Sequence, residues 1–485
     1  MKALRISAWI LCGLLGLLLV VALILAAAKA QDYGGESVQA DPGIGRMLEA
    51  APSVDSPPDF EYSDFIDHKW TNASDELKAE FAGSNAFILI QAFLLLFGLL
   101  GYTLMVAALA RRSPARFSPL IALGVISLTF FSFLVFGFDF AYPAEYLPGR
   151  LIADYSGPWF IGMDADPFQY GLAFTMWTDF LFQAAYAMTA SMLVLGLLAG
   201  NYRAPAVAIT SLAVGVIGYP LITSWIWADG WLSNLGSYDF AGGANLHVLS
   251  GSAGFALILL SRIFPAEAPG KLSTATSHQV AAPRVPAMPW NPRRMTVFLI
   301  GAVIFLFGPL AVQIGSVLSN DHTVVPVVAT TAFAAIVSAA CTSLVLSFFL
   351  RGRPRLVTVT IGGLAGWSAI CAPGDLLDLS TASVIGALAG AFSCLLLWVM
   401  DRTDFDDPMG LVPIGLVGGT IGLIAAGAIS EETSLIVQFM VVIATISVGF
   451  TLGTCTGLLA WLTGFLWERQ EQSTPAAPPP LQTSP

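Results

Sequence analysis

The chain has 485 residues, of which 56% are hydrophobic and 11% are charged, and its formal net charge is −11 at pH 7. Soluble domains are typically about 45–50% apolar and about 25% charged, so the composition excludes an ordinary soluble protein. It predicts an all-α membrane protein, because helices satisfy their own backbone groups in lipid. The acids lie in loops and no basic stripe is present, which excludes a nucleic-acid partner.

The N-terminal segment, residues 1–30, has the three parts of a secretory signal. Lys2 and Arg5 precede a long apolar run, and a small-x-small sequence ends just before Gln31. The run is also long enough to be an uncleaved anchor, and both alternatives stay open. The segment 31–83 is rich in Asp, Ser and Pro, and we expect it to be an external acidic segment.

Eleven apolar stretches follow, each near the length that a helix needs to cross a bilayer. Basic loop residues such as Arg203, Arg351 and Arg402 fall almost entirely on one side of these spans. The positive-inside rule therefore predicts a multi-pass protein of the cell inner membrane, with the mature N-terminus periplasmic and the C-terminus cytoplasmic. The spans cover residues 84–110, 117–142, 170–198, 205–227, 243–263, 296–317, 324–350, 356–373, 381–400, 411–430 and 434–467.

The spans form one membrane domain, 84–467, with a Pro- and Ala-rich connector, 264–295, predicted to be cytoplasmic. Residues 468–485 lack apolar content and are expected to be a disordered cytoplasmic tail. The five cysteines are interpreted as small buried side chains, because none has a C-x-x-C partner. With neither a metal cluster nor a nucleophile–base pair in view, we expect no cofactor, no metal and no enzymatic activity.

Two spans begin with the same spacing of residues. Five spans separate the copies, so they cross the membrane in opposite directions and indicate two inverted five-helix halves followed by a long eleventh helix. The aspartates are expected to cap backbone amides, and the glycines to let helices approach closely. The matched positions are Asp239, His247, Gly251 and Gly254 in the first copy and Asp407, Gly415, Gly419 and Gly422 in the second.

His247 is the only histidine inside a predicted span. A buried histidine with one hydrogen bond is a common structural feature, but ionisable residues within membranes are functional candidates by default. The second copy has Gly415 at the matched position, and no neighbour replaces the missing side chain. The space there is either empty, water-filled or occupied by a neighbour that moves in, and a polar pocket beside a single imidazole favours water.

At this point the sequence resembles the ammonium transporter (Amt/Rh/Mep) family over residues 84–467. Asp239-Phe-Ala-Gly-Gly followed by His247 is similar to the most recognisable motif of the family. The other matching motifs, in family order, are Asn85-Ala-Phe, Phe182-Gln-x-x-Tyr186-Ala, Tyr219 to Trp227, Gly315-Ser316, Gly363-Leu-Ala-Gly366 and Asp406-Asp407-Pro408.

The resemblance implies eleven helices in two inverted halves, a homotrimer with a pore in each subunit, and ammonium or ammonia as substrate. It also names a PII-type cytoplasmic regulator as a possible partner. By the same resemblance, substrate-binding positions are Trp227, Ser316, Tyr186 and Asp239, and pore positions are His247, Phe182 and Gly415. The chain departs from the family at Gly415, where the second pore histidine is missing, and at Val312, which aligns with a pore aromatic.

The first functional hypothesis is transport of ammonium or ammonia across the inner membrane. The alternative is an ammonium-binding sensor or non-conducting receptor on the same scaffold, which the missing second histidine favours. Asp179 shares a helix face with Phe182 and Tyr186. Its carboxylate is expected either to steer ammonium to the pore mouth or to be a paired helix-end residue.

Overall fold

The structure is a computed structural model that describes residues 70–110, 119–143, 146–147, 149–154, 170, 172–200, 202–263, 291–403 and 405–473. Within these ranges the regular elements are helices, apart from one isolated bridge between Tyr146 and Ala153. The signal or anchor segment 1–30, most of the acidic segment and most of the connector 264–295 lie outside the described residues.

The helices follow the predicted spans in order. Ten helical segments are long and apolar enough to cross a membrane, and the shorter apolar helix α14 accounts for the eighth predicted span. The first half contains α4 (Asp75–Leu109); α5 (Pro119–Ser132), η2 (Phe133–Gly137) and α6 (Phe138–Ala141); α7 (Met176–Leu195) and η3 (Gly196–Ala199); α8 (Ala204–Ala213), η4 (Val214–Gly218) and α9 (Tyr219–Trp227); the short η5 (Ser233–Leu235); and η6 (Gly243–Val248) with α10 (Leu249–Ile263). The second half contains α11 (Pro292–Phe305) and α12 (Phe307–Gly315); α13 (Val324–Arg351); α14 (Leu356–Ile370); α15 (Leu379–Met400); and η7 (Val412–Gly418) with α16 (Gly419–Ile429); α17 (Leu435–Ser473) follows.

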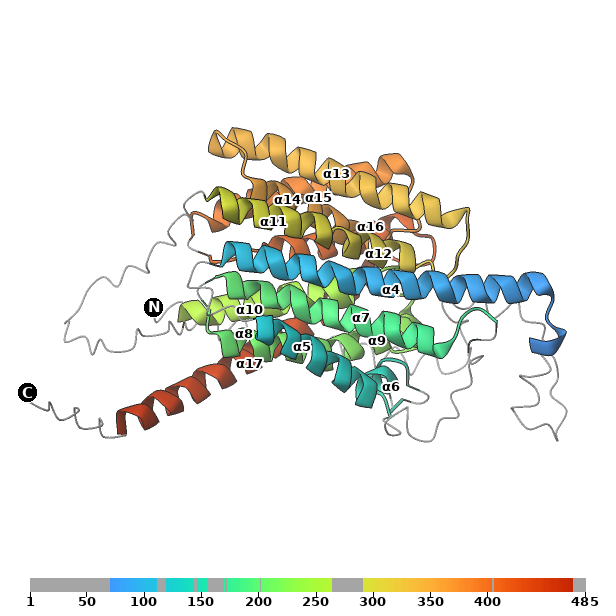
Figure 1. Ribbon diagram of the computed structural model, residues 1–485, viewed down its shortest axis with the longest axis horizontal. Helices are drawn as coiled ribbons and strands as arrows, with labels where there is room; N and C mark the ends of the chain where they lie inside the picture. Colours follow the sequence, from blue (N-terminus) through green and yellow to red (C-terminus); the bar gives the residue numbers. More distant parts are fainter. Residues whose placement is uncertain are drawn as a thin grey trace, which may run out of the picture.

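The helices form one bundle with their axes roughly side by side (Figure 1). Helix α4 packs against α7, α11 and α12, whereas α13, α14 and α15 pack on one another. Helix α17 crosses the bundle obliquely and packs against α8, α10 and α16. The segments η6 and η7, far apart in the sequence, are in contact, so the two repeat copies meet inside the bundle.

Two predicted boundaries are wrong. Helix α4 begins at Asp75 instead of residue 84, with the Ser74 hydroxyl accepting a hydrogen bond from the Leu77 amide. It therefore projects beyond its neighbours (Figure 1). Helix α17 continues to Ser473, so residues 468–473 are helical rather than part of the expected disordered tail. Polar residues extend both helices because their backbones are already ordered by the apolar turns next to them.

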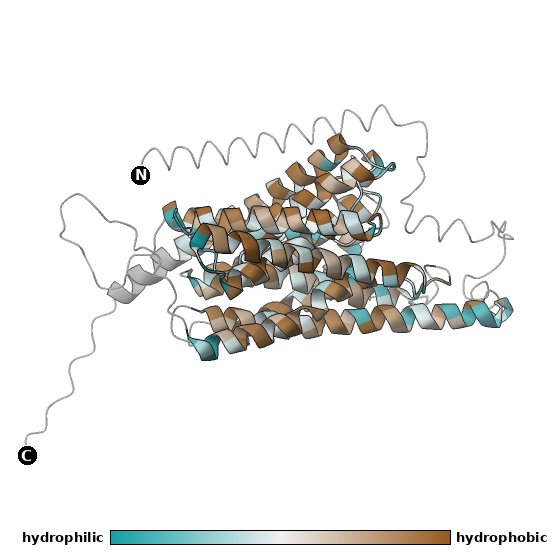
Figure 2. Ribbon diagram, turned by 90° about the horizontal axis from the view of Figure 1, so that it is seen from above, coloured by the Kyte–Doolittle hydropathy of each residue, from teal (hydrophilic) through white to brown (hydrophobic). Residues whose placement is uncertain are grey.

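The outer surface of the bundle is apolar (Figure 2). Large side chains point outward along several helices, including Leu120, Phe349 and Ile436, which are 72%, 75% and 74% exposed. A soluble monomer rarely exposes contiguous apolar surface on this scale. The chain is therefore a multi-pass membrane protein whose outer side chains contact lipid or a further subunit.

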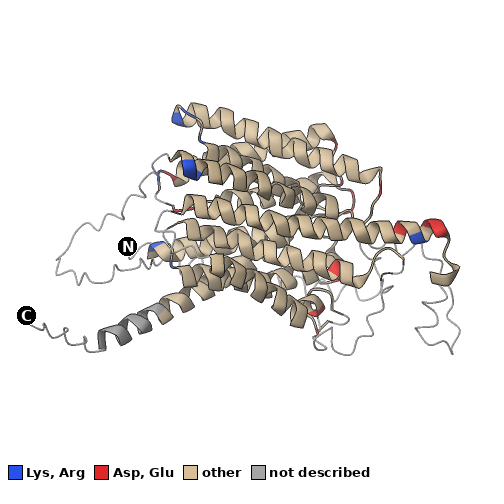
Figure 3. Cartoon of the chain, in the orientation of Figure 1, with Lys and Arg blue, Asp and Glu red and all other residues tan. Residues whose placement is uncertain are grey.

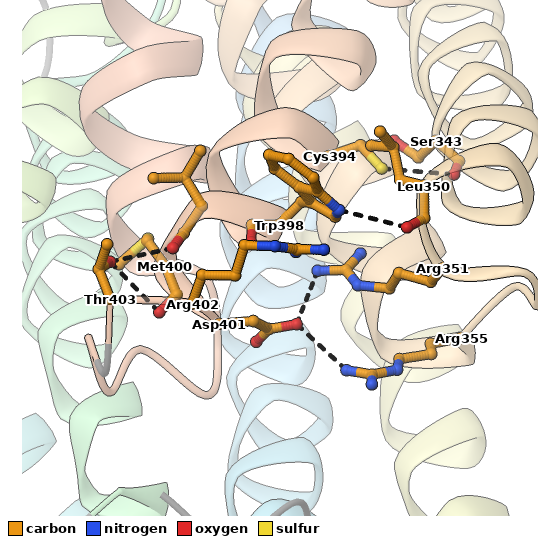
Figure 4. Close-up of polar contacts among 11 residues, drawn as sticks. Ser343, Leu350, Arg351, Arg355, Cys394, Trp398, Met400, Asp401, Arg402 and Thr403 are labelled. Carbon is orange, nitrogen blue, oxygen red and sulfur yellow. Dashed lines mark hydrogen bonds and ion pairs between the residues drawn. The ribbon is translucent and has the colours of Figure 1, made fainter. Parts of the chain in front are cut away.

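Most of the described Lys and Arg residues lie at one end of the bundle (Figure 3). Figure 4 shows a cluster there at the ends of α13 and α15. The Asp401 carboxylate accepts from Arg351 at 2.8 Å and from Arg355 at 3.2 Å, and the Arg402 guanidinium lies 3.6 Å from the centre of the Trp398 ring. These contacts tie the segment between α13 and α14 to the end of α15.

The two repeat copies begin with the same local structure. Asp239 accepts hydrogen bonds from the amides four and five residues later, Gly243 at 2.7 Å and Ala244 at 2.8 Å. Asp407 does the same, with the Leu411 and Val412 amides at 2.8 Å each. The residue three positions after each aspartate is a glycine with positive φ, +86° for Gly242 and +67° for Gly410. The predicted capping role of both aspartates is confirmed.

Candidate functional site

The predicted outer residues lie together in the structure. The Tyr186 hydroxyl is 2.6 Å from the Ser316 hydroxyl, and it donates to the Val312 carbonyl oxygen at 3.1 Å. The Tyr186 ring packs edge-on against Phe182 and Trp227, with ring centroids 4.9 and 6.0 Å apart. Helices α7, α9 and α12 thus contribute to one cluster of aromatic rings and hydroxyl groups.

A glycine makes room for this cluster. A Cβ atom at Gly315 would lie 2.4 Å from the tip of the Phe182 ring. Since such a separation is far below van der Waals contact, any larger residue would push Phe182 away from Tyr186. The Gly315-Ser316 pair therefore has two parts: the glycine admits the ring, and the serine supplies the hydroxyl.

Asp239 holds the segment between α9 and η6 in place through its backbone as well as its side chain. The Trp227 indole N–H donates to the Asp239 carbonyl oxygen at 2.6 Å. Burial raises the pKa of the Asp239 carboxyl to about 6, while the amides of Ala244, Gly243 and Gly242 lower it. Both carboxyl oxygens accept from backbone amides, so the contacts of this group in the structure are those of a cap.

Asp179 does not face solvent in the structure. Its side chain is 5% exposed, and its carboxylate accepts a hydrogen bond from the Tyr170 hydroxyl at 3.0 Å. The steering hypothesis requires a carboxylate that faces solvent. The structure instead supports the alternative, a paired carboxylate near the start of α7.

His247 is fully buried in η6, and its partners come from the second half of the chain. Its Nε2 atom lies 3.3 Å from the Cys371 sulfur, at the end of α14. The Gln313 side-chain amide, on α12, donates to the same sulfur at 3.2 Å. The Trp367 ring packs edge-on against the imidazole, with centroids 4.4 Å apart. This inner group lies about one helical turn from Ser316, because Gln313 precedes Ser316 by three positions on the same face of α12.

Three atoms of this inner group have no hydrogen-bonding partner in the described part of the chain. They are Nδ1 of His247, Oε1 of Gln313 and Nε1 of Trp367, all on side chains with no exposed surface. Buried polar atoms are nearly always hydrogen-bonded. The inner group therefore has one imidazole nitrogen, one amide oxygen and one indole N–H that can still bind a small polar molecule.

Of the three alternatives for the space beside Gly415, the structure shows a neighbour that has moved in, so the favoured water-filled space is wrong. A Cβ atom at Gly415 would lie 2.6 Å from the His247 carbonyl oxygen and 2.9 Å from the Gly251 Cα atom. The backbones of η6 and α10 occupy the space that the missing side chain would need. A Cβ on Gly251 would meet the Leu416 amide nitrogen at 2.3 Å, so the close helix approach predicted at Gly251 is confirmed.

Sequence reasoning missed Cys371, Gln313 and Trp367. Cys371 was interpreted as a small buried hydrophobe; it is buried, but its sulfur accepts a hydrogen bond from Gln313 and contacts His247. The available signal was Gln313, an amide within an apolar span, since such a group requires a partner in the membrane interior.

A sequence profile of the Ammonium Transporter Family matches residues 86–474. The chain is 26% identical over 359 residues to Ammonium transporter Amt2 of Archaeoglobus fulgidus, covering 71% of this chain and 70% of that protein. It is 31% identical over 265 residues to Ammonium transporter Amt2 of Haloferax mediterranei, covering 52% and 55% of the two chains.

Solved structures have the same fold. A protein described as Sensor Amt Protein superposes with a TM-score of 0.64 at 21% identity, over 81% of this chain and 95% of that one. Candida albicans Mep2 superposes with a TM-score of 0.65 at 18% identity, over 81% and 87%. At this level of identity the likeness concerns the fold, and it agrees with the predicted helical membrane architecture.

Proposed function

Because this chain belongs to the ammonium transporter family, whose members are transporters rather than enzymes, we propose that it carries ammonium or ammonia through a pore in each subunit. The observation that carries the proposal is the placement of Tyr186, Trp227 and Ser316 around one point, with the buried His247 group next to it in the interior. The aromatic rings suit a small cation, because ring faces attract positive charge.

The proposed route begins at the aromatic cluster. There the hydroxyl oxygen of Ser316 can replace part of the hydration shell of ammonium. Moving an intact ammonium ion from water into the apolar interior would cost several kcal/mol in lost hydration. Ammonia alone crosses at lower cost, so we propose that the proton is released near this cluster and that His247 accepts or relays it.

The proposed setting is a homotrimer in the cell inner membrane, with the N-terminal end of α4 periplasmic and α17 ending in the cytoplasm. The grouping of Arg residues at one end of the bundle supports this orientation. A cytoplasmic partner such as a PII-type regulator would approach that basic end.

Uptake of labelled methylammonium in a host without ammonium transporters tests the proposal. The native chain should support uptake and ammonium-dependent growth, and His247→Ala should abolish both. Cys394→Ala is a matched control, since this thiol is also fully buried but lies on α15 and bonds to the Ser343 carbonyl. Tight ammonium binding to the purified protein without uptake would refute transport and indicate a sensor.

A further inference from the structure

The hydrogen bonds around Cys371 decide which nitrogen of His247 carries the proton. The Cys371 sulfur has three neighbours within hydrogen-bonding reach: Nε2 of His247 at 3.3 Å, Nε2 of Gln313 at 3.2 Å, and the Trp367 carbonyl oxygen at 3.4 Å. A thiol has one proton to donate and can accept with its lone pairs. The amide of Gln313 is a donor, so the sulfur accepts there.

The Trp367 carbonyl takes the thiol proton because its helical partner is missing. Helix α14 ends at Ile370, and the Cys371 amide turns to the Ser368 carbonyl oxygen instead of the Trp367 oxygen four residues back. Carbonyl groups in the last turn of a helix require another donor. The thiol of Cys371 is in place to supply it, at 3.4 Å.

With its single proton directed to Trp367, the sulfur can only accept from His247. We infer that Cys371 holds His247 in the tautomer protonated at Nε2, which leaves Nδ1 as a bare acceptor for an N–H group of ammonium or ammonia. Nδ1 is fully buried and has no partner in the described protein. The identity of the bound molecule rests on the proposed function; the tautomer does not.

Cys371 is thus a positioning residue that acts through the imidazole. It contacts His247, which lies eight residues after the aspartate of the first repeat copy. Cys371 itself directly follows α14 and belongs to neither copy. The opposite tautomer would leave the Nε2 lone pair facing the sulfur, and would present an N–H instead of an acceptor at Nδ1. Only the inferred arrangement satisfies the carbonyl of Trp367 and offers the substrate an acceptor.

Nitrogen-15 NMR of the purified full chain, labelled in its histidine rings, tests the tautomer directly. The chain has four histidines, and His247→Gln identifies the signals of the one in question. Correlation of each ring nitrogen with the ring protons distinguishes Nδ1 from Nε2. We expect a protonated Nε2 and a bare Nδ1 in the native protein. A protonated Nδ1 overturns the inference.

Variants separate positioning from packing. Cys371→Ser keeps one donor and the acceptor lone pairs, so it should retain the tautomer, whereas Cys371→Ala should give a mixture of tautomers. Cys394→Ala should leave the ring signals unchanged. Methylammonium uptake should fall about three- to tenfold in Cys371→Ala, the worth of one hydrogen bond, and recover in Cys371→Ser. An unchanged tautomer in folded Cys371→Ala overturns the inference. Absence of uptake in the native chain would overturn the proposed function alone, because the tautomer is read without transport.

Discussion

The contact between η7 and α10 gives a direct prediction for Gly415. A new Cβ there would lie 2.6, 2.9 and 3.0 Å from the His247 carbonyl oxygen and from Cα and N of Gly251. All three are backbone atoms, so no side chain can rotate out of the way and the two segments must separate. Overpacking of this kind costs about 1–3 kcal/mol, and we expect Gly415→Ala to fall at the upper end.

Gly124 provides the matched control. It lies in α5, and a Cβ atom there would meet nothing within 4 Å. Both substitutions gain similar helix propensity, about 1 kcal/mol, so the difference between them isolates the clash. Gly415→Ala should therefore be less stable than Gly124→Ala by about 3 kcal/mol.

The assay is the apparent Tm of the purified protein in detergent, with all variants heated at one rate because unfolding of such proteins is commonly irreversible. Gly415→Ala should melt several degrees below Gly124→Ala. Gly415→His should be less stable still and should show no gain in transport, since the larger side chain has no cavity to enter. Equal apparent Tm values for the two alanine variants would refute the close contact.

Three further predictions use other contacts. Asp407→Ala removes the acceptor of the Leu411 and Val412 amides and should cost about 1–2 kcal/mol, as the loss of a helix cap does; Asp407→Asn should lose less, and apparent Tm measures both. Tyr186→Phe frees the Ser316 hydroxyl from its 2.6 Å hydrogen bond, so the half-saturating methylammonium concentration in uptake assays should fall by up to about tenfold. A rise in that concentration would show that the tyrosine hydroxyl binds substrate. Asp179→Asn should lower stability with no dependence of uptake on ionic strength, because the carboxylate is buried; strong suppression of the variant's uptake defect by added salt would restore the steering hypothesis.

The sequence allowed much of the scaffold to be predicted, because its signals are local. Apolar length defines the spans, and the repeated spacing from Asp239 and Asp407 predicted two capped helix starts that the structure contains. The aromatic cluster around Tyr186 was predicted through the family resemblance, motif by motif, and its members are in contact.

The inner group could not be predicted in the same way. Cys371 contacts His247 across 124 positions of sequence, and a single cysteine among apolar residues is usually only a core side chain. A glycine at position 415 is compatible with an empty cavity, with a water-filled cavity or with a closer approach of the neighbouring helices. Only the separation of η7 and α10 distinguishes these outcomes, and that separation depends on packing throughout the bundle.

The two repeat copies share a backbone plan and differ in chemistry. Their aspartates accept from amides at the same two offsets, so the helices start alike and meet at Gly251 and Gly415. At the position eight residues after each aspartate, one copy places an imidazole and the other only backbone contact. His247 therefore finds its partners on α12 and α14 instead of on its repeat mate. It follows that substitutions at Cys371, Gln313 or Trp367 act on the imidazole directly, whereas substitutions at Gly415 first move the helices that carry it.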